Sequence, residues 1–186
     1  VRSSAASDVY KRQPHIGTDI LIEVVERMRE EIIRLGGEFL FHSQVTDILP
    51  KENCLIVNGC HRIETDAAVF AVGHSARDTF QMLFDRNVAM KSKSFAIGVR
   101  AEHRQDMIDE AMYGRKERGP LGAAAYKLTA QLENGRGVYT FCMCPGGYVV
   151  NASSEQGRLA VNGMSYHDRA GENANSAVIG LSLIHI

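Results

Sequence analysis

The chain has 186 residues, of which 45% are hydrophobic and 23% charged, and its formal net charge is −1. This composition is typical of a globular domain. It lacks the basic excess of a nucleic-acid binder and the acidic runs of a disordered tail. No apolar run approaches the roughly 20 residues that cross a bilayer. The length predicts one domain or two small ones.

The two ends of the chain are related through their coding DNA. Residues 8–13 can be encoded by DNA whose reverse complement encodes Leu-Ser-Leu-Ile-His-Ile, the sequence of residues 181–186. That DNA resembles the transposon-end adapter of sequencing libraries. We therefore interpret residues 1–13 and 181–186 as non-native tails, expect the first to pack loosely, and expect residues 14–180 to be an internal fragment of a longer protein. The alternative is a natural basic arm and a natural apolar terminal strand.

A long amphipathic helix is predicted over residues 17–37. Its apolar residues recur at three- and four-residue spacing and form one stripe that we expect to be buried: Leu21, Val24, Val25, Met28, Ile32 and Leu35. Thr18 or Asp19 supplies an N-cap oxygen, and Gly36 with Gly37 supplies the left-handed stop.

Short strands and a second helix are predicted next. Turn residues separate four runs of strand-forming residues: Glu38–His42, Val45–Leu49, Cys54–Val57 and Arg62–Glu64. Residues 67–73 form a continuous apolar run, which is typical of a strand buried on both faces. A helix over residues 75–88 would have Ser75 as its N-cap and Asp78 three residues later.

From residue 91 the pattern changes to strands joined by short turns. Residues 94–103 indicate a strand, residues 104–114 a short helix that Gly114 ends, and residues 115–125 an exposed loop. Three further strands favour an antiparallel meander: Gly137–Cys144, Tyr148–Ala152 and Arg158–Tyr166. Residues 167–180 carry little signal.

The order of these segments, with an apolar strand that ends in A-x-G-x-S, occurs in flavoproteins of the two-dinucleotide-type fold. Five segments resemble the bacterial family of uncharacterised FAD-dependent dehydrogenases, or NAD(P)/FAD-dependent oxidoreductases: residues 14–19, 71–80, 95–103, 135–167 and 171–177. The resemblance implies an α/β fold. Residues 14–90 would be the later part of an FAD-binding domain, and residues 91–180 an α+β substrate domain with an antiparallel sheet.

The resemblance also shows which parts of the family's cofactor site the sequence lacks. The glycine-rich motif that binds the pyrophosphate would precede residue 14, and the glycine-rich segment that meets the flavin would follow residue 180. We therefore expect that the 186-residue chain does not hold FAD tightly. A stoichiometric flavin absorption band that survives gel filtration would contradict this expectation.

Two candidate cofactor contacts lie in the first half of the chain. In such folds the strand end at Val45 faces the adenine, and simple strand packing is the alternative. Gly73, His74 and Ser75 lie between a strand and a helix, where open α/β sheets bind ligands and exposed N–H groups favour an anion. A structural turn with a capping serine is the alternative there.

A third candidate contact precedes the first helix. His15, Gly17 and Thr18 lie in a loop that we expect to approach the flavin. Plain N-capping explains Thr18 on its spacing alone.

The four cysteines lack the C-x2-C spacing of a zinc site and form no disulfide framework, so a reducing cytoplasm is the default compartment. Cys142 and Cys144 would face the same way on a strand, about 6.6 Å apart. That separation is at the far edge of disulfide geometry, so a reversible disulfide would need the strand to buckle. Packing as small hydrophobic residues is the alternative. His103 and His167 are candidates for proton transfer, with ordinary hydrogen bonding as their alternative.

The sequence thus predicts a fragment of an FAD-dependent oxidoreductase, a dehydrogenase that transfers a hydride between flavin N5 and a small-molecule substrate. NAD(P)H is a candidate electron donor, and the fragment itself is expected to be inactive. No metal, nucleic acid or membrane is expected as a partner, and neither a catalytic residue nor an oligomeric state is specified. The alternative is a non-catalytic flavin- or nucleotide-binding protein that senses or assembles.

Overall fold

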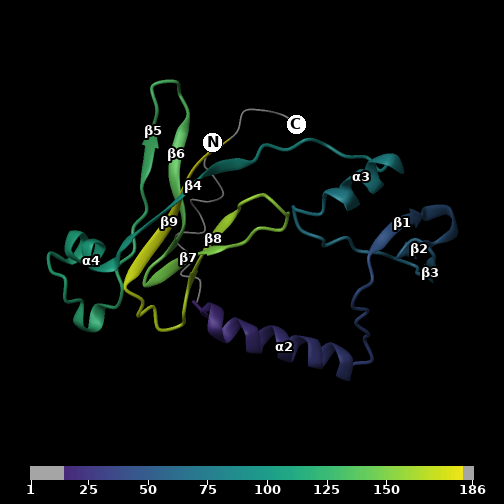
Figure 1. The fold of residues 1–186 in the computed structure, drawn as a ribbon, viewed down its shortest axis with the longest axis horizontal. Coiled ribbons are helices and arrows are strands. Elements are labelled where there is room, and N and C mark those ends of the chain that lie inside the picture. The colour runs from purple at the N-terminus through teal and green to yellow at the C-terminus, as the bar shows by residue number, and fades with distance from the viewer. Residues whose placement is uncertain (1–14, 182–186) are drawn as a thin grey trace. The chain divides into compact units, whose positions relative to one another are not determined.

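The computed structural model in Figure 1 describes residues 15–181 of the chain. These residues divide into two compact units, one of residues 15–31 and 94–181 and the other of residues 32–93. The predicted division at residue 90 assigned the first helix to the earlier domain, whereas most of that helix clusters with the later residues. The functions expected of the two predicted domains remain predictions.

The predicted tails lie almost wholly outside the described residues. The expectation that residues 1–13 pack loosely therefore remains a prediction, as does the interpretation of residues 182–186. Leu181, the first residue of the second predicted tail, is the last residue of strand β9 and pairs with Ala96. The strand therefore continues one residue past the predicted boundary.

The unit of residues 32–93 is an antiparallel sheet with one helix. Its elements are β1 (Val45–Leu49), the 3-10 turn η1 (Pro50–Glu52), β2 (Cys54–Val57), β3 (His61–Glu64) and α3 (Arg77–Asp85). The strands pair in the order β1-β2-β3, which confirms three predicted strands. Ile48, Cys54 and Val57 are buried and provide the apolar centre of this small sheet.

Two strands predicted in this unit are wrong. Neither residues 38–42 nor residues 67–73 form a strand. A strand needs a neighbour to satisfy its backbone N–H and C=O groups. No described strand pairs with the apolar run of residues 67–73, and its Val69 is 91% exposed. Hydrophobicity alone therefore does not make this run a strand.

The start of α3 also differs from the prediction. Ala76 occupies the N-cap position without a side-chain hydrogen bond, so the predicted capping role of Ser75 is wrong. Ser75 instead accepts a hydrogen bond at its backbone oxygen from the N–H of Arg77, at 2.9 Å. Asp78 accepts a hydrogen bond from Nε2 of Gln44, at 2.6 Å, which ties the first turn of α3 to the segment before β1.

The other unit is built on a four-stranded antiparallel sheet (Figure 1). Its elements are β4 (Ala96–Arg104), α4 (Gln105–Tyr113), the 3-10 turn η2 (Gly119–Leu121), β5 (Thr129–Gln131), β6 (Gly137–Cys144), β7 (Gly147–Asn151), β8 (Val161–Ser165) and β9 (Asn173–Leu181). The sheet has the order β4-β9-β6-β5. Gly114 ends α4 in the left-handed conformation, at φ 71°, as predicted.

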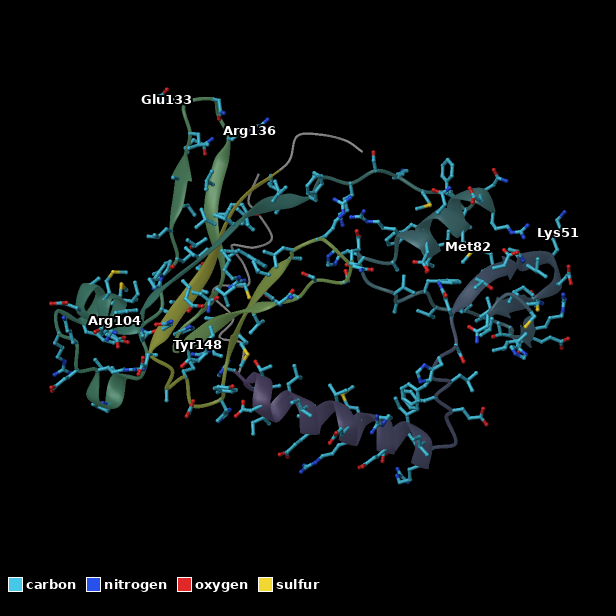
Figure 2. All side chains as sticks on the ribbon, in the orientation of Figure 1. Lys51, Met82, Arg104, Glu133, Arg136 and Tyr148 are labelled. Carbon is cyan, nitrogen blue, oxygen red and sulfur yellow. The ribbon has the colours of Figure 1, made fainter. Side chains whose placement is uncertain are left out.

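The predicted meander is only partly correct. β7 and β8 pair as an antiparallel hairpin, but β6 pairs with β5 and β9 rather than with β7. The hairpin of β5 and β6 carries Glu133 and Arg136 at its exposed tip (Figure 2). The sequence pattern identified β6, β7 and β8, but it missed β5 and β9, and it placed β6 beside the wrong neighbour.

Strand β9 was missed from the sequence although it lies between β4 and β6 in the sheet. Its start is polar, and Asn175 and Ser176 are fully buried there. Buried polar side chains are stable only when they are hydrogen-bonded. Asn175 accepts from Arg100, and the Ser176 hydroxyl lies 3.3 Å from the carbonyl oxygen of Phe141. Partners distant in sequence thus stabilise a strand that lacks an apolar pattern.

The predicted long helix is present as α2 (Thr18–Arg34), and Gly36 follows it at φ +90° as the left-handed stop. No residue of α2 is buried, so the expectation of a buried apolar stripe is wrong for the described structure. Met28, for example, is 60% exposed. An amphipathic stripe is buried only against a complementary surface. No helix in residues 15–181 is long and apolar enough to cross a membrane.

Candidate functional site

A pocket of about 510 Å³ lies in the unit of residues 15–31 and 94–181. Three segments line it: the residues around the start of α2, the end of β6 and the end of β8. It includes His15, Gly17 and Thr18, three of the candidate cofactor-binding residues, together with Cys142 and Cys144. The fold therefore brings the predicted loop and the two cysteines to one cavity.

Hydrogen bonds fasten the start of α2 to the end of β8. The Thr18 hydroxyl donates to the carbonyl oxygen of Ser165, at 3.1 Å, and Oδ1 of Asp19 accepts from the N–H of His167, at 2.9 Å. The helix begins at Thr18, and Gly17 supplies the first accepting carbonyl, to Leu21 N–H at 3.0 Å. The Thr18 hydroxyl therefore bonds to the end of β8 and does not cap the helix as predicted.

The two histidines at this junction stack on one another. The ring centroids of His15 and His167 lie 6.3 Å apart. Nε2 of His15 lies 2.9 Å from the carbonyl oxygen of Tyr166, and Nδ1 of His167 lies 2.7 Å from that of Ile16. Each ring thus has a backbone partner in the opposite segment, and of the two residues His15 lines the pocket.

Gly17→Ala is expected to destabilise this junction. Gly17 has φ +90°, and a Cβ built on it would lie 2.3 Å from the backbone nitrogen of His167. Gly157 is the matched control, because it has φ +73° but open space around its Cβ position. Gly157→Ala should cost about 1 kcal/mol for the backbone conformation alone, and Gly17→Ala roughly 2 kcal/mol more. Urea unfolding measures both, and equal losses would contradict the steric argument.

A β-bulge shapes the end of β6. Phe141 pairs with Ala177 on β9 and Cys144 pairs with Asn175, so three steps along β6 oppose two steps along β9. Cys142 adopts φ 49°, the left-handed conformation. The strand therefore buckles between Phe141 and Cys144, as contact between the two cysteines requires.

The two thiols differ in exposure and in acidity. Cys142 is exposed and Cys144 is buried, and neither is in a disulfide. A hydrogen bond from the Cys144 thiol, with the hydrogen bond and charge of Arg100, lowers the pKa of Cys142 to about 5. The same hydrogen bond and burial raise the pKa of Cys144. The pair thus consists of an accessible thiolate and a protonated thiol beside it.

Arg100 on β4 is held beside this pair by buried polar groups. Its Nη1 donates to Oδ1 of Asn175, at 2.6 Å, and to the carbonyl oxygen of Cys142, at 3.1 Å. Gly163 makes room for this arrangement, because a Cβ there would lie 2.1 Å from Nη1 of Arg100 and 2.8 Å from Sγ of Cys144. The glycine on β8 therefore allows the guanidinium to approach the thiols.

A buried network supports the turn that follows Cys144. Nε2 of Gln105 donates to Asp109 at 2.7 Å, and Oε1 of Gln105 accepts from Gly146 N–H at 2.8 Å. Nε of Arg118 lies 3.2 Å from the Asp109 carboxylate, and the Arg118 guanidinium also donates to the carbonyl oxygen of Arg169. The network thus connects the N-terminal part of α4 with the turn after β6 and with Arg169, which both border the pocket.

The remaining candidate residues lie in the other unit. A pocket of about 460 Å³ there is lined by Val45, by apolar residues that include several of the segment 67–76, and by polar residues that include Asp78. Gly73, His74 and Ser75 are exposed and do not line it. Gly73 has φ +74° with open space at its Cβ position. The structure therefore does not bring all four residues to one cavity, and their cofactor-binding role remains a prediction.

Sequence reasoning missed Arg100 and Arg169 as site residues. Arg169 lines the pocket, and its buried Nε has no hydrogen-bond partner among residues 15–181. No local motif marks either arginine, since strand pairing brings Arg100 to Cys142 and a turn after β8 brings Arg169 to the pocket. The candidate His103 lies elsewhere, with Nε2 2.8 Å from the Tyr126 hydroxyl.

Comparison with known proteins bears on the later unit. Residues 94–182 match the family model described as "FAD-dependent protein, C-terminal domain-like". The chain is also similar to an uncharacterized protein of Clostridium beijerinckii, with 51% identity over 185 residues, covering 96% of this chain and 34% of the relative. The chain thus spans about one third of that relative's length. The family match supports a flavoprotein-related domain and includes both cysteines of the pocket.

Proposed function

We propose that the chain is part of an FAD-dependent oxidoreductase, a dehydrogenase in which residues 32–93 belong to a two-dinucleotide-type FAD-binding domain and residues 94–181 to a substrate domain. The observation that carries this proposal is the similarity of residues 94–182 to the C-terminal domain of FAD-dependent proteins. The antiparallel sheet of that unit and its pocket beside the start of α2 are compatible with a substrate-binding role.

The residues present fit parts of the cofactor. Apolar walls around Val45 suit the flat ring of an adenine, and the pocket volume of about 460 Å³ is within the usual range for ligand sites. Open space around Gly73 permits close approach of a ligand to the backbone. His15, Gly17 and Thr18 would border the flavin end. When bound, the flavin would supply hydride transfer at N5.

The chain's own residues would hold and orient the substrate. Arg169 lines the pocket of about 510 Å³, and the hydrogen bond between Thr18 and Ser165 holds two of its walls together. The substrate is a small molecule, NAD(P)H is the proposed electron donor, and the cytoplasm is the proposed compartment. We propose neither a nucleic acid nor a membrane as partner.

The test uses the whole product of the reading frame in which residues 14–180 lie. The purified protein is expected to carry FAD that NADH or NADPH reduces and a small-molecule acceptor reoxidises, followed by the flavin absorption band. Flavin that stays oxidised with every donor would favour a binding or sensing protein instead. Absence of flavin after reconstitution with FAD would contradict the proposal.

A matched pair of substitutions tests the adenine site. Val45→Asp places a second carboxylate beside Asp78 in the pocket wall and should lower the bound FAD about tenfold, since an unpaired, partly buried charge is unfavourable beside an apolar ring. Lys51→Asp introduces the same residue in the exposed turn after β1 (Figure 2) and should leave the FAD content unchanged. Equal FAD content in both variants would remove Val45 from the site.

A further inference from the structure

Two thiols in the pocket at the β6 bulge are not used by the proposed hydride transfer. Cys142 and Cys144 both line this pocket, which lies within a single compact unit of the chain. Cys142 is open to solvent, whereas Cys144 is 8% exposed. Cys142 is thus accessible to a dissolved reactant. Cys144 is shielded from solvent and can react only with a group that is already attached to Cys142.

The bulge brings the Cys144 side chain against Cys142. In a regular strand, residues i and i+2 stand apart along one face. Here the extra residue of the bulge and the left-handed backbone of Cys142 break that regularity. The Cys144 thiol donates to the carbonyl oxygen of Cys142, at 3.4 Å, and its interaction with the Cys142 thiol lowers the pKa of Cys142. A bulge is a built feature of a sheet that redirects a side chain.

The surroundings of the thiols are cationic. Arg100 from β4 contacts Cys142, and Arg169 from the segment after β8 lines the same pocket. None of the described residues that line this pocket is acidic. Its ionisable residues are Cys142, Cys144, Arg169 and His15. Positive charge beside a thiol favours the thiolate, which is the nucleophile in exchange with a disulfide.

We propose that Cys142 and Cys144 form a redox-active dithiol that reduces small disulfides carrying carboxylate groups. The Cys142 thiolate attacks one sulfur of the disulfide RSSR, forms the mixed disulfide Cys142–S–SR and releases one thiolate RS⁻. Cys144 then loses its proton to solvent and attacks Cys142, which forms the Cys142–Cys144 disulfide and releases the second RS⁻. Two electrons pass from the protein dithiol to RSSR, and a thiol reductant reverses the reaction.

The substrate class follows from Arg169. Its buried Nε lacks a partner among the described residues, and Arg169 is one of the residues that line the cavity with the thiols. A guanidinium binds a carboxylate through charge-assisted hydrogen bonds. A disulfide with carboxylates would therefore be held with its sulfurs near Cys142. The reaction needs no flavin, so it is tested apart from the proposed hydride transfer.

The first experiment follows the reduced 186-residue chain with oxidised glutathione, by mass spectrometry of its peptides. The native chain is expected to yield the Cys142–Cys144 disulfide. Cys144→Ser should stop at glutathione attached to Cys142, because the serine hydroxyl cannot resolve the mixed disulfide. Cys142→Ser should leave Cys144 unmodified, and Cys60→Ser, the control for an exposed cysteine of the other unit, should react like the native chain. Glutathione that stays on Cys142 of the native chain would overturn the proposal.

The second experiment tests the carboxylate preference. Arg169→Met should slow the reaction with oxidised glutathione roughly tenfold, the value of one charge-assisted contact. It should not slow the reaction with cystamine, a disulfide that carries amines. Arg169→Lys should restore part of the rate. Equal slowing with both disulfides would reject the assigned substrate class and indicate a structural role for Arg169. Neither the disulfide products nor these rates depend on flavin. Failure of the proposed flavin reduction would therefore leave both results unchanged.

Discussion

Cys142 is expected to react with iodoacetamide at pH ~5 roughly 10- to 100-fold faster in the folded chain than in the chain unfolded by urea, after allowance for the lower nucleophilicity of a more acidic thiol. The thiolate is the reactive form, and a thiol in an unfolded chain has a pKa of about 8.5. Contacts with Cys144 and Arg100 lower the pKa of Cys142 to about 5 in the folded chain. Because the pKa is lowered, the thiolate is present above it and is lost as the pH falls through it. The rate should therefore be nearly flat above pH ~6.

Substitutions of Cys144 separate the causes of this acidity. Cys144→Ala removes the hydrogen-bond donor and should move the midpoint of the alkylation profile upward by more than one pH unit. Cys144→Ser retains a donor and should move it less. Peptide mapping assigns the label to Cys142, and circular dichroism checks that each variant is folded. A profile of Cys142 that is identical in folded and unfolded chains would exclude an activated thiol.

The sequence supported one half of this site and not the other. The positions of Cys142 and Cys144 two residues apart on a predicted strand marked them as a pair, and this spacing required a buckled strand for their contact. Arg100 lies 42 residues before Cys142 in the sequence, and Arg169 follows a different strand. Only the pairing of β9 with both β4 and β6 brings Arg100 to the thiols. Periodicity reports the face of an element, whereas strand order depends on contacts between distant segments.

The same limit explains the strands that were missed or wrongly predicted. Residues 67–73 have the composition of a buried strand but no described neighbour to pair with. Residues 173–181 have a polar start, yet they form a central strand. There Oδ1 of Asn175 accepts from Arg100, and the Ser176 hydroxyl lies 3.3 Å from the carbonyl oxygen of Phe141. Helix α2 and its glycine stop were predictable because capping and helical periodicity are local.

Asp109→Ala is expected to lower the free energy of unfolding by about 3 kcal/mol, the scale for leaving buried partners of a carboxylate unpaired. Asp109 is 1% exposed and accepts from Gln105 at 2.7 Å and from the N–H of Ala124 at 2.9 Å, while Arg118 lies 3.2 Å away. Alanine leaves these donors without an acceptor in the interior. Because total stability is commonly ~5–15 kcal/mol, this is a large fraction of it. Urea unfolding measures the change.

Two comparisons show whether the loss comes from the network. Asp109→Asn keeps one acceptor but removes the charge opposite Arg118, so its effect should be smaller than that of alanine. Glu133→Ala, at the exposed tip of the β5–β6 hairpin (Figure 2), should change stability by less than about 0.5 kcal/mol. Through Gln105 the network holds the N–H of Gly146, two residues after Cys144. Asp109→Ala should therefore also change the alkylation profile of Cys142, and an unchanged profile would mean that the bulge holds its shape without this support.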